Sequence, residues 1–187
     1  LTQEGVLERD LFLSPKGPRR RAVNALSVAA NKARSIGAAD AAERKYRLAL
    51  DLLASVKVDD RSLELNVTNL RAVVGMDLCN LLDERGDSRL YDEREGVANL
   101  VAGGDCSIET SYRAAFGLAL SEFEKGNFDA ALKKFSEVER LVNFRYHNLL
   151  EKIQSGEDNQ FDIKDVIDTM RYSVMIEINR GRVFYTK

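Results

Sequence analysis

The sequence predicts an all-α protein, an α-solenoid of about three antiparallel helix pairs followed by one additional C-terminal helix. Three observations support this fold class. The 187 residues are rich in Ala and Leu and include only two prolines, which argues against a β fold with many turns. Apolar side chains recur every three or four residues, the spacing of one helix face. Glycines separate these periodic segments, and glycine readily adopts the left-handed backbone that ends a helix.

Four helices are expected in the N-terminal half, after a short leading helix over 3–13 that ends at a break over 14–18. The first runs from Arg19 to a turn at Gly37. Its successors cover 39–55, 61–85 and 89–101, and Gly96 interrupts the last of them at a cost of about 1 kcal/mol relative to Ala. The side chains expected to face inward are Val23, Leu26, Ala30, Ala33, Ala42, Tyr46, Ala49, Leu50, Leu53, Leu63, Val67, Leu70, Val74, Leu78 and Leu81.

Three helices are expected in the C-terminal half, over 107–125, 128–153 and 162–180, with a turn at Gly126 and a polar loop over 155–159. In the last helix we expect Tyr172, Met175 and Ile176 to dock on the stack or to begin another pair. Its other inward residues are expected to be Ile163, Val166, Ile167, Met170 and Val174. We assign 1–18 to an N-terminal helix and linker and 19–187 to one helical domain, and we expect the chain to be a fragment of a longer protein.

Composition excludes several functional classes. Lys plus Arg number 28 and Asp plus Glu 30, so the formal net charge of −2 provides no overall field that would attract nucleic acid or an anionic membrane. Two cysteines cannot form a disulfide framework, and a single histidine excludes His-x-x-x-His metal motifs. No apolar run approaches the roughly 20 residues that cross a bilayer. We therefore expect an intracellular, cytoplasmic protein with no cofactor, metal site or membrane span.

An internal repeat links the two halves of the chain. Each copy places a turn glycine 11 residues after an apolar residue, a small alanine five residues after the glycine, and an aromatic residue four further on. The copies are Leu26, Ala30, Gly37, Ala42 and Tyr46, then Ala115, Ala119, Gly126, Ala131 and Phe135. This pattern resembles the tetratricopeptide repeat (TPR). The pair over 61–101 departs from it, because Tyr91 stands where a small residue is wanted, and the family's closing proline is absent throughout.

The resemblance implies a partner-binding groove lined by the first helix of each pair. It nominates Asn24, Ser27, Asn31, Arg34, Arg113, Phe116 and Leu120. A family variant clamps a C-terminal carboxylate, and Asn31 and Arg113 match two of its positions. Ser27, Asp77 and Gly117 depart from that variant, and the acid at Asp77 would repel a carboxylate. The predicted function is therefore a non-catalytic scaffold or adaptor that holds a peptide or helix of another protein.

Two alternatives remain open at the level of sequence. A basic cluster of Lys16, Arg19, Arg20 and Arg21 would allow a helical repeat to bind RNA, although a solvated helix start is the preferred interpretation of the same residues. A subunit of a larger complex would instead use its outer faces. The interleaved charges over 83–95 predict an exposed face linked by salt bridges. Catalysis is not expected, because the chain carries no nucleophile elbow and no phosphate-binding glycine loop.

Overall fold

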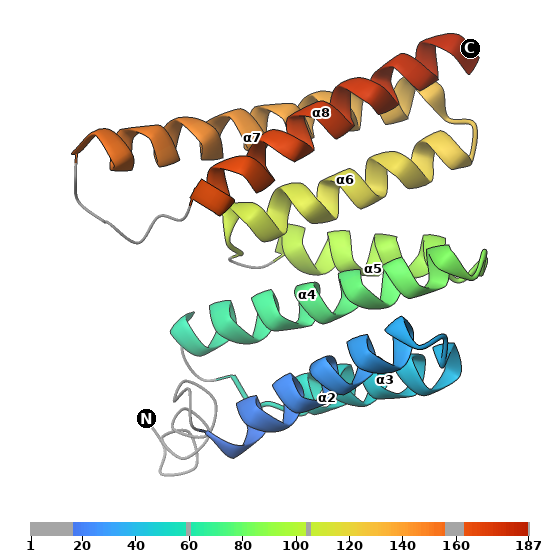
Figure 1. The fold of residues 1–187 in the computed structure, drawn as a ribbon, viewed down its shortest axis with the longest axis vertical. Helices are drawn as coiled ribbons and strands as arrows, with labels where there is room; N and C mark the ends of the chain where they lie inside the picture. The colour runs from blue at the N-terminus through green and yellow to red at the C-terminus, as the bar shows by residue number, and fades with distance from the viewer. Residues whose placement is uncertain (1–16, 59–60, 104–105, 156–162, 187) are drawn as a thin grey trace. The chain divides into compact units, whose positions relative to one another are not determined.

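The computed structural model describes residues 17–58, 61–103, 106–155 and 163–186 (Figure 1). These residues form only α-helices and no strand, which confirms the predicted all-α class. The predicted helix over 3–13 and nearly all of the loop over 155–159 lie outside the described residues. The helices are α2 (Pro18–Ser35), α3 (Ala39–Ala54), α4 (Arg61–Glu84), α5 (Leu90–Gly103), α6 (Ile108–Glu124), α7 (Phe128–Ser155) and α8 (Ile163–Thr186).

The chain divides into two compact units, residues 1–106 and residues 107–187. Within the first unit α2 packs against α3, α3 against α4, and α4 against α5. Within the second unit α6 packs against α7, and α7 against α8. Within each unit, helices that follow one another in the sequence therefore pack together, and short turns join the members of three pairs (Figure 1).

The three pairs α2–α3, α4–α5 and α6–α7 turn in the same way, at Gly37, Gly86 and Gly126. These glycines have φ values of 76°, 63° and 79°, in the left-handed region that favours glycine. The glycine N–H donates to the carbonyl three residues earlier, and the next N–H donates to the carbonyl five residues earlier, at 2.8–3.0 Å. This is the Schellman arrangement, which satisfies the last carbonyls of the first helix. The predicted turns at Gly37 and Gly126 are confirmed.

Small side chains allow the first and third pairs to approach closely. In the first pair Ala30 and Ala42 are completely buried, and Tyr46 fills the space beside them. In the third pair Ala119, Ala131 and Phe135 are buried to the same extent. Because dense interiors tolerate little added volume, these positions favour alanine over any larger residue.

In the middle pair, α4–α5, different residues allow the two helices to approach closely. Helix α5 begins four residues after Gly86, whereas α3 and α7 begin two residues after their glycines. This shift buries Leu90, Arg94 and Val97 and leaves Tyr91 only half-buried. The smallest residue lies on α4 instead, where a Cβ built on Gly75 would stand 2.6 Å from Val97 Cγ2. The shifted start of α5 explains why the sequence pattern fits this pair poorly.

Helix α8 covers the α6–α7 pair with only some of the residues expected to face inward. The predicted inward residues Ile167, Met170 and Val174 are 45–58% exposed, and Met175 is 41% exposed. Ile176 is buried and Tyr172 packs against the same core, as predicted, and Val183 is buried there as well. The prediction was wrong for the exposed residues because α8 carries apolar residues on two opposite sides, and periodicity alone does not select one.

Polar groups on the buried side of α8 are satisfied within the helix itself. Thr169 Oγ1 donates to the Asp165 carbonyl, and Asn179 Nδ2 donates to the Met175 carbonyl, both at 2.8 Å. Arg180 then joins α8 to α7 through Glu139 and Ser136, at 2.8 Å each. A mixed polar and aromatic face can therefore be buried without leaving these side chains unpaired.

Candidate functional site

Two of the four groove residues predicted on α2 form hydrogen bonds to other helices. Asn24 is exposed and Ser27 is half-buried. Asn31 Oδ1 accepts a 2.7 Å hydrogen bond from Tyr46 Oη. Arg34 Nε donates to Glu84 Oε2 at 2.9 Å, which ties the end of α2 to the end of α4. The structure thus brings these four residues onto one side of α2, where two of them already hold other helices.

The groove residues predicted on α6 differ from one another in their burial and contacts. Arg113 pairs with Glu109 one turn earlier, at 3.6 Å. Phe116 is only 5% exposed and meets the rings of Phe135 and Tyr172 edge-on, with centroids 5.8 and 5.7 Å away. Leu120 packs half-buried beside the same core. Phe116 is therefore a core residue covered by α8 and not an exposed groove residue, which corrects the prediction.

The predicted basic cluster is less open than its sequence indicates. Lys16 lies outside the described residues. Arg19 and Arg20 are half-buried, and Arg21 is exposed. Helix α2 begins directly after Gly17, with Pro18 at its first position, a favourable place because proline lacks the N–H that would otherwise be unpaired.

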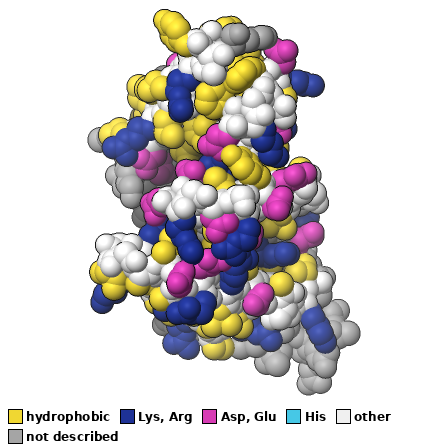
Figure 2. All heavy atoms as spheres, turned by 90° about the vertical axis from the view of Figure 1, so that its right-hand side faces the viewer, with side chains coloured by type: hydrophobic (Ala, Val, Ile, Leu, Met, Phe, Trp, Pro, Cys, Tyr) yellow, Lys and Arg dark blue, Asp and Glu magenta, His cyan; other side chains and the backbone are white. Residues whose placement is uncertain are grey.

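Ion pairs join α3 to the turn between α4 and α5. Glu43 is central, since its carboxylate binds Arg47 at 3.0 Å, Arg85 at 3.0 Å and Arg89 at 2.9 Å. Arg47 also binds Glu93, and Arg89 also binds Asp87. Figure 2 faces the edge on which the Gly37 and Gly86 turns lie and shows acidic and basic side chains interleaved there. The charged face predicted over 83–95 is confirmed, with partners on α3 that the sequence analysis did not identify.

This network sets the ionisation of its carboxylates. Burial alone would raise the pKa of Glu43, but hydrogen bonds from Arg47 and Arg89 outweigh burial and lower it. The side chain and backbone N–H of Arg89 lower the pKa of Asp87 to about 2. These carboxylates are therefore fully charged at neutral pH, and the network is structural in character.

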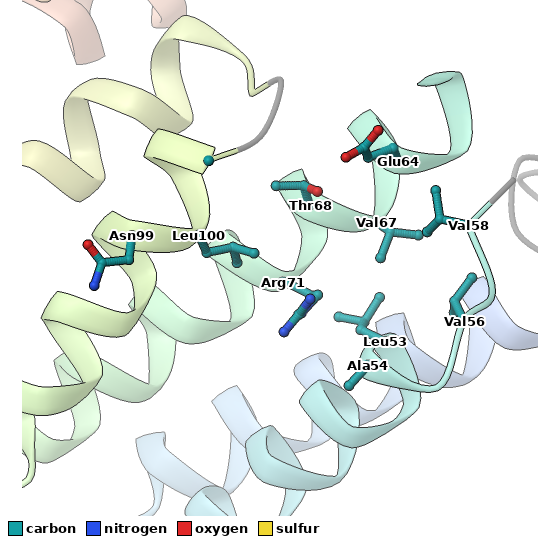
Figure 3. A pocket seen from close by; sticks show the side chains of 11 residues that line it. Leu53, Ala54, Val56, Val58, Glu64, Val67, Thr68, Arg71, Asn99 and Leu100 are labelled. Atoms are coloured by element: carbon teal, nitrogen blue, oxygen red, sulfur yellow. The ribbon is translucent and has the colours of Figure 1, made fainter. Parts of the chain in front are cut away.

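A hollow of about 340 Å³ lies within the first unit (Figure 3). Its walls come from the end of α3, the connector after it, the first half of α4 and the end of α5. Figure 3 shows Arg71 of α4 between Leu100 of α5 and Leu53 of α3, with Glu64 further along α4. The lining residues are Leu53, Ala54, Val56, Val58, Glu64, Val67, Thr68, Arg71, Asn99, Leu100 and Gly103. No motif in the sequence indicates this site, because residues from three helices and a connector form it.

The outer side of α8 is a second candidate surface, within the second unit. We define the α8 outer face as Ile167, Met170, Val174 and Ile178, which are 45–58% exposed and spaced three or four residues apart. Met170 and Val174 also line a hollow of about 320 Å³ between α8 and α7, which includes Val142 and Tyr146. Figure 2 shows apolar side chains at the surface of this unit. A row of aliphatic side chains beside a hollow is suited to another helix.

The described residues contain no group of three or more His, Cys, Asp or Glu side chains placed to hold a metal ion. His147 is exposed beside Tyr146 on α7. Burial raises the pKa of the Cys79 thiol to about 12, which suppresses the nucleophilic thiolate.

Comparison with known proteins adds no relative. No protein-family model, curated protein or solved structure matches this chain. Among the described helices, none combines the length and apolar character needed to cross a membrane.

Proposed function

We propose that this chain is a non-catalytic interaction scaffold built from TPR-like helix pairs, and that it holds a partner protein on its surface. The observation that carries the proposal is the α8 outer face. Ile167, Met170, Val174 and Ile178 expose an aliphatic row, while the opposite side of the same helix is buried on α6 and α7. Exposed apolar rows of this kind commonly mark sites of protein interaction.

Two further observations support a TPR-like solenoid. Three glycine turns share one hydrogen-bond pattern, and the first and third pairs bury alanines and an aromatic residue at equivalent positions. Stacked helix pairs bury their apolar faces against neighbouring pairs, and such repeats often present extended binding surfaces. We further propose a reducing, intracellular setting, because two cysteines are too few to form a disulfide framework in a chain of this size.

A helix of the partner is the occupant we propose for the α8 outer face. Side chains spaced at i, i+3 and i+7 on α8 match the ridge of an amphipathic helix, and the hollow beside Met170 and Val174 can receive one of its larger residues. Arg171 and Glu177 flank the row and are 72% and 65% exposed in their side chains. They pair with Asp168 and Arg180 one turn away on α8, and a charged partner helix that exchanged these pairs for its own would be set in orientation by them.

The proposal is tested by quantitative capture of proteins from an extract of the source cells with the full chain as bait. The variant is the double substitution Met170→Glu and Val174→Glu. The matched control is Leu48→Glu, which places the same charge on a 50% exposed leucine of α3. We expect the captured amount of a defined set of proteins to be at least tenfold lower with the double variant than with the wild-type chain. The amount captured with the control should equal that of the wild-type chain. If both variants capture the same proteins in the same amounts, the proposal is wrong.

Loss of folding would give a trivial result, so both baits are first compared by circular dichroism and thermal unfolding. Because all three substituted positions are about half exposed, we expect each change to alter the free energy of unfolding by no more than about 0.5 kcal/mol. A captured protein is then shortened to its shortest bound segment. That segment should be helical when bound, with apolar residues three and four positions apart.

A further inference from the structure

The hollow in the first unit, separate from the α8 outer face, has an arginine that the fold does not use. Arg71 is half-buried, yet it forms no hydrogen bond or ion pair within the described part of the chain. Elsewhere in this unit Arg34, Arg47 and Arg94 each bind a carboxylate of another helix or turn. A guanidinium beside apolar walls gains most from a carboxylate, which it can bind through two parallel hydrogen bonds.

Glu64 gives the hollow a second charged end. It lies two helical turns before Arg71 on α4, about 10 Å away along the helix axis. Its side chain is exposed and forms no ion pair within the described residues. The α4 wall between the two charges is made by Val67 and Thr68, and Leu53 and Leu100 face it from α3 and α5. The hollow thus has a positive end and a negative end, with Val67, Thr68, Leu53 and Leu100 between them.

We propose that this hollow binds an extended segment of a partner protein that carries an acidic and a basic residue three positions apart, with two aliphatic residues between them. An extended chain advances about 3.4 Å per residue, so three residues cover the distance from Arg71 to Glu64. The acidic residue binds Arg71 and the basic residue binds Glu64. The aliphatic residues lie against Val67, Leu53 and Leu100.

The size of the hollow limits what it can bind. Asn99, at the end of α5, is part of the lining, but its amide points away from Leu100 and Arg71 (Figure 3). A volume of about 340 Å³ is at the lower end of the range for ligand pockets, about 300–1,000 Å³. The site is therefore sized for a few side chains of a linear segment rather than for a whole helix.

The test measures binding of fluorescein-labelled peptides to the full chain by fluorescence anisotropy. The core of each peptide is X-Leu-Val-Z, capped at both ends and extended by Gly and Ser. X and Z are Asp and Lys, Lys and Asp, Asp and Asp, or Lys and Lys. We expect at least one of the two mixed-charge peptides to bind at least tenfold more tightly than either like-charge peptide. Replacing Leu-Val by Ser-Ser should abolish that binding.

Charge reversal in the protein gives the decisive comparison. Arg71→Glu leaves two carboxylates in the hollow and should shift the preference to the Lys and Lys peptide. Glu64→Arg should shift it to the Asp and Asp peptide. Arg44→Glu, on an exposed position of α3 outside the hollow, should leave the mixed-charge preference unchanged. A general loss of folding would weaken the binding of all four peptides together, so it would not produce these shifts in preference.

Three results would overturn the inference. The first is equal binding of all four peptides or no binding at millimolar concentration. The second is an unchanged preference in both charge-reversal variants. The third is a dimer in sedimentation experiments that Arg71→Glu dissociates, because the occupant would then be a second copy of this chain. None of these results bears on the α8 outer face, so the two proposals fail independently.

Discussion

Gly75 in α4 faces Val97 in α5 so closely that a Cβ on the glycine would stand 2.6 Å from Val97 Cγ2. Real Cβ atoms do not approach another heavy atom this closely, and the branched valine side chain has little freedom to move away. The middle helix pair therefore depends on the absence of a side chain at one position of α4.

Replacing that glycine should destabilise the first unit. We expect Gly75→Ala to lower the free energy of unfolding by about 1–3 kcal/mol, as in other overpacked cores. Val97→Ala in the same chain should recover part of the loss, because it removes the methyl group that clashes. Urea unfolding of the single and double variants measures this coupling.

The control for this experiment is Gly96→Ala in α5. A Cβ there would meet no described atom within 4 Å. Because alanine is the better helix former, we expect stability to rise by about 0.5–1 kcal/mol. Destabilisation by both substitutions would point to a general intolerance of α4 and α5 and would contradict the role of the Gly75–Val97 contact.

The turn at Gly126 should be sensitive to any residue with a side chain, for a backbone reason rather than a packing reason. Its φ of 79° is unfavourable for other L-residues, and no described atom would lie within 4 Å of a Cβ there. We expect Gly126→Ala to cost about 1–2 kcal/mol, and Gly126→Asn to cost less because asparagine tolerates this conformation better. Thermal unfolding compares both with Gly181→Ala, a helical position with open space that should show no such loss.

The ion-pair network around Glu43 should make the first unit sensitive to acid. A carboxyl whose pKa is lower in the folded state stabilises the protein above its unfolded pKa, and this contribution is lost as pH falls through the folded pKa. The pKa of Glu43 is lowered from 4.5, and that of Asp87 from 3.8 to about 2. We therefore expect the free energy of unfolding to decline from about pH 4.5 to about pH 2.

Removing the central charge should flatten this dependence. Glu43→Gln is expected to cost about 1–2 kcal/mol at pH 7, after allowance for the partly exposed arginines. It should also reduce the slope below pH 4.5. Glu95→Gln, on an exposed position of α5, is the matched control and should change neither quantity. A wild-type slope in the Glu43→Gln variant would show that other carboxyls carry the acid sensitivity.

The hydrogen bond from Tyr46 Oη to Asn31 Oδ1, at 2.7 Å, should contribute to the stability of the α2–α3 pair. Removing the hydroxyl with Tyr46→Phe should cost about 1 kcal/mol. Asn31→Ala should cost a similar amount, and the double variant should lose little more than either single one. Fully additive losses in urea unfolding would mean that the two residues act separately.

The sequence allowed accurate prediction of local features. The helix ends fall within about three residues of the predicted ones except in α8, which continues to Thr186. Gly37 and Gly126 correctly predicted the turns, because few residues other than glycine adopt the positive φ that these turns require. The buried alanines and aromatics of the first and third pairs were also foreseeable, since their spacing repeats in the sequence.

The candidate surfaces depended on tertiary structure and were not predictable in the same way. Helix α8 is apolar on two sides, and only the shape of the α6–α7 surface, with the rings of Tyr112 and Phe116, selects the side that carries Tyr172. Arg71 resembles any helical arginine in the sequence. Its importance arises from what surrounds it in space, since no carboxylate of the described chain pairs with it.

The shared geometry of the three glycine turns fixes how the chain can change in length. An α-helix rotates by about 100° per residue, so one residue inserted between Gly126 and Ala131 would swing Ala131 and Phe135 away from α6 and place Ala130 and Lys134 in their positions. The number of residues between the glycine turn and the buried alanine and aromatic residue is therefore constrained. Insertions and deletions should be selected against within these turns far more strongly than at an exposed helix end.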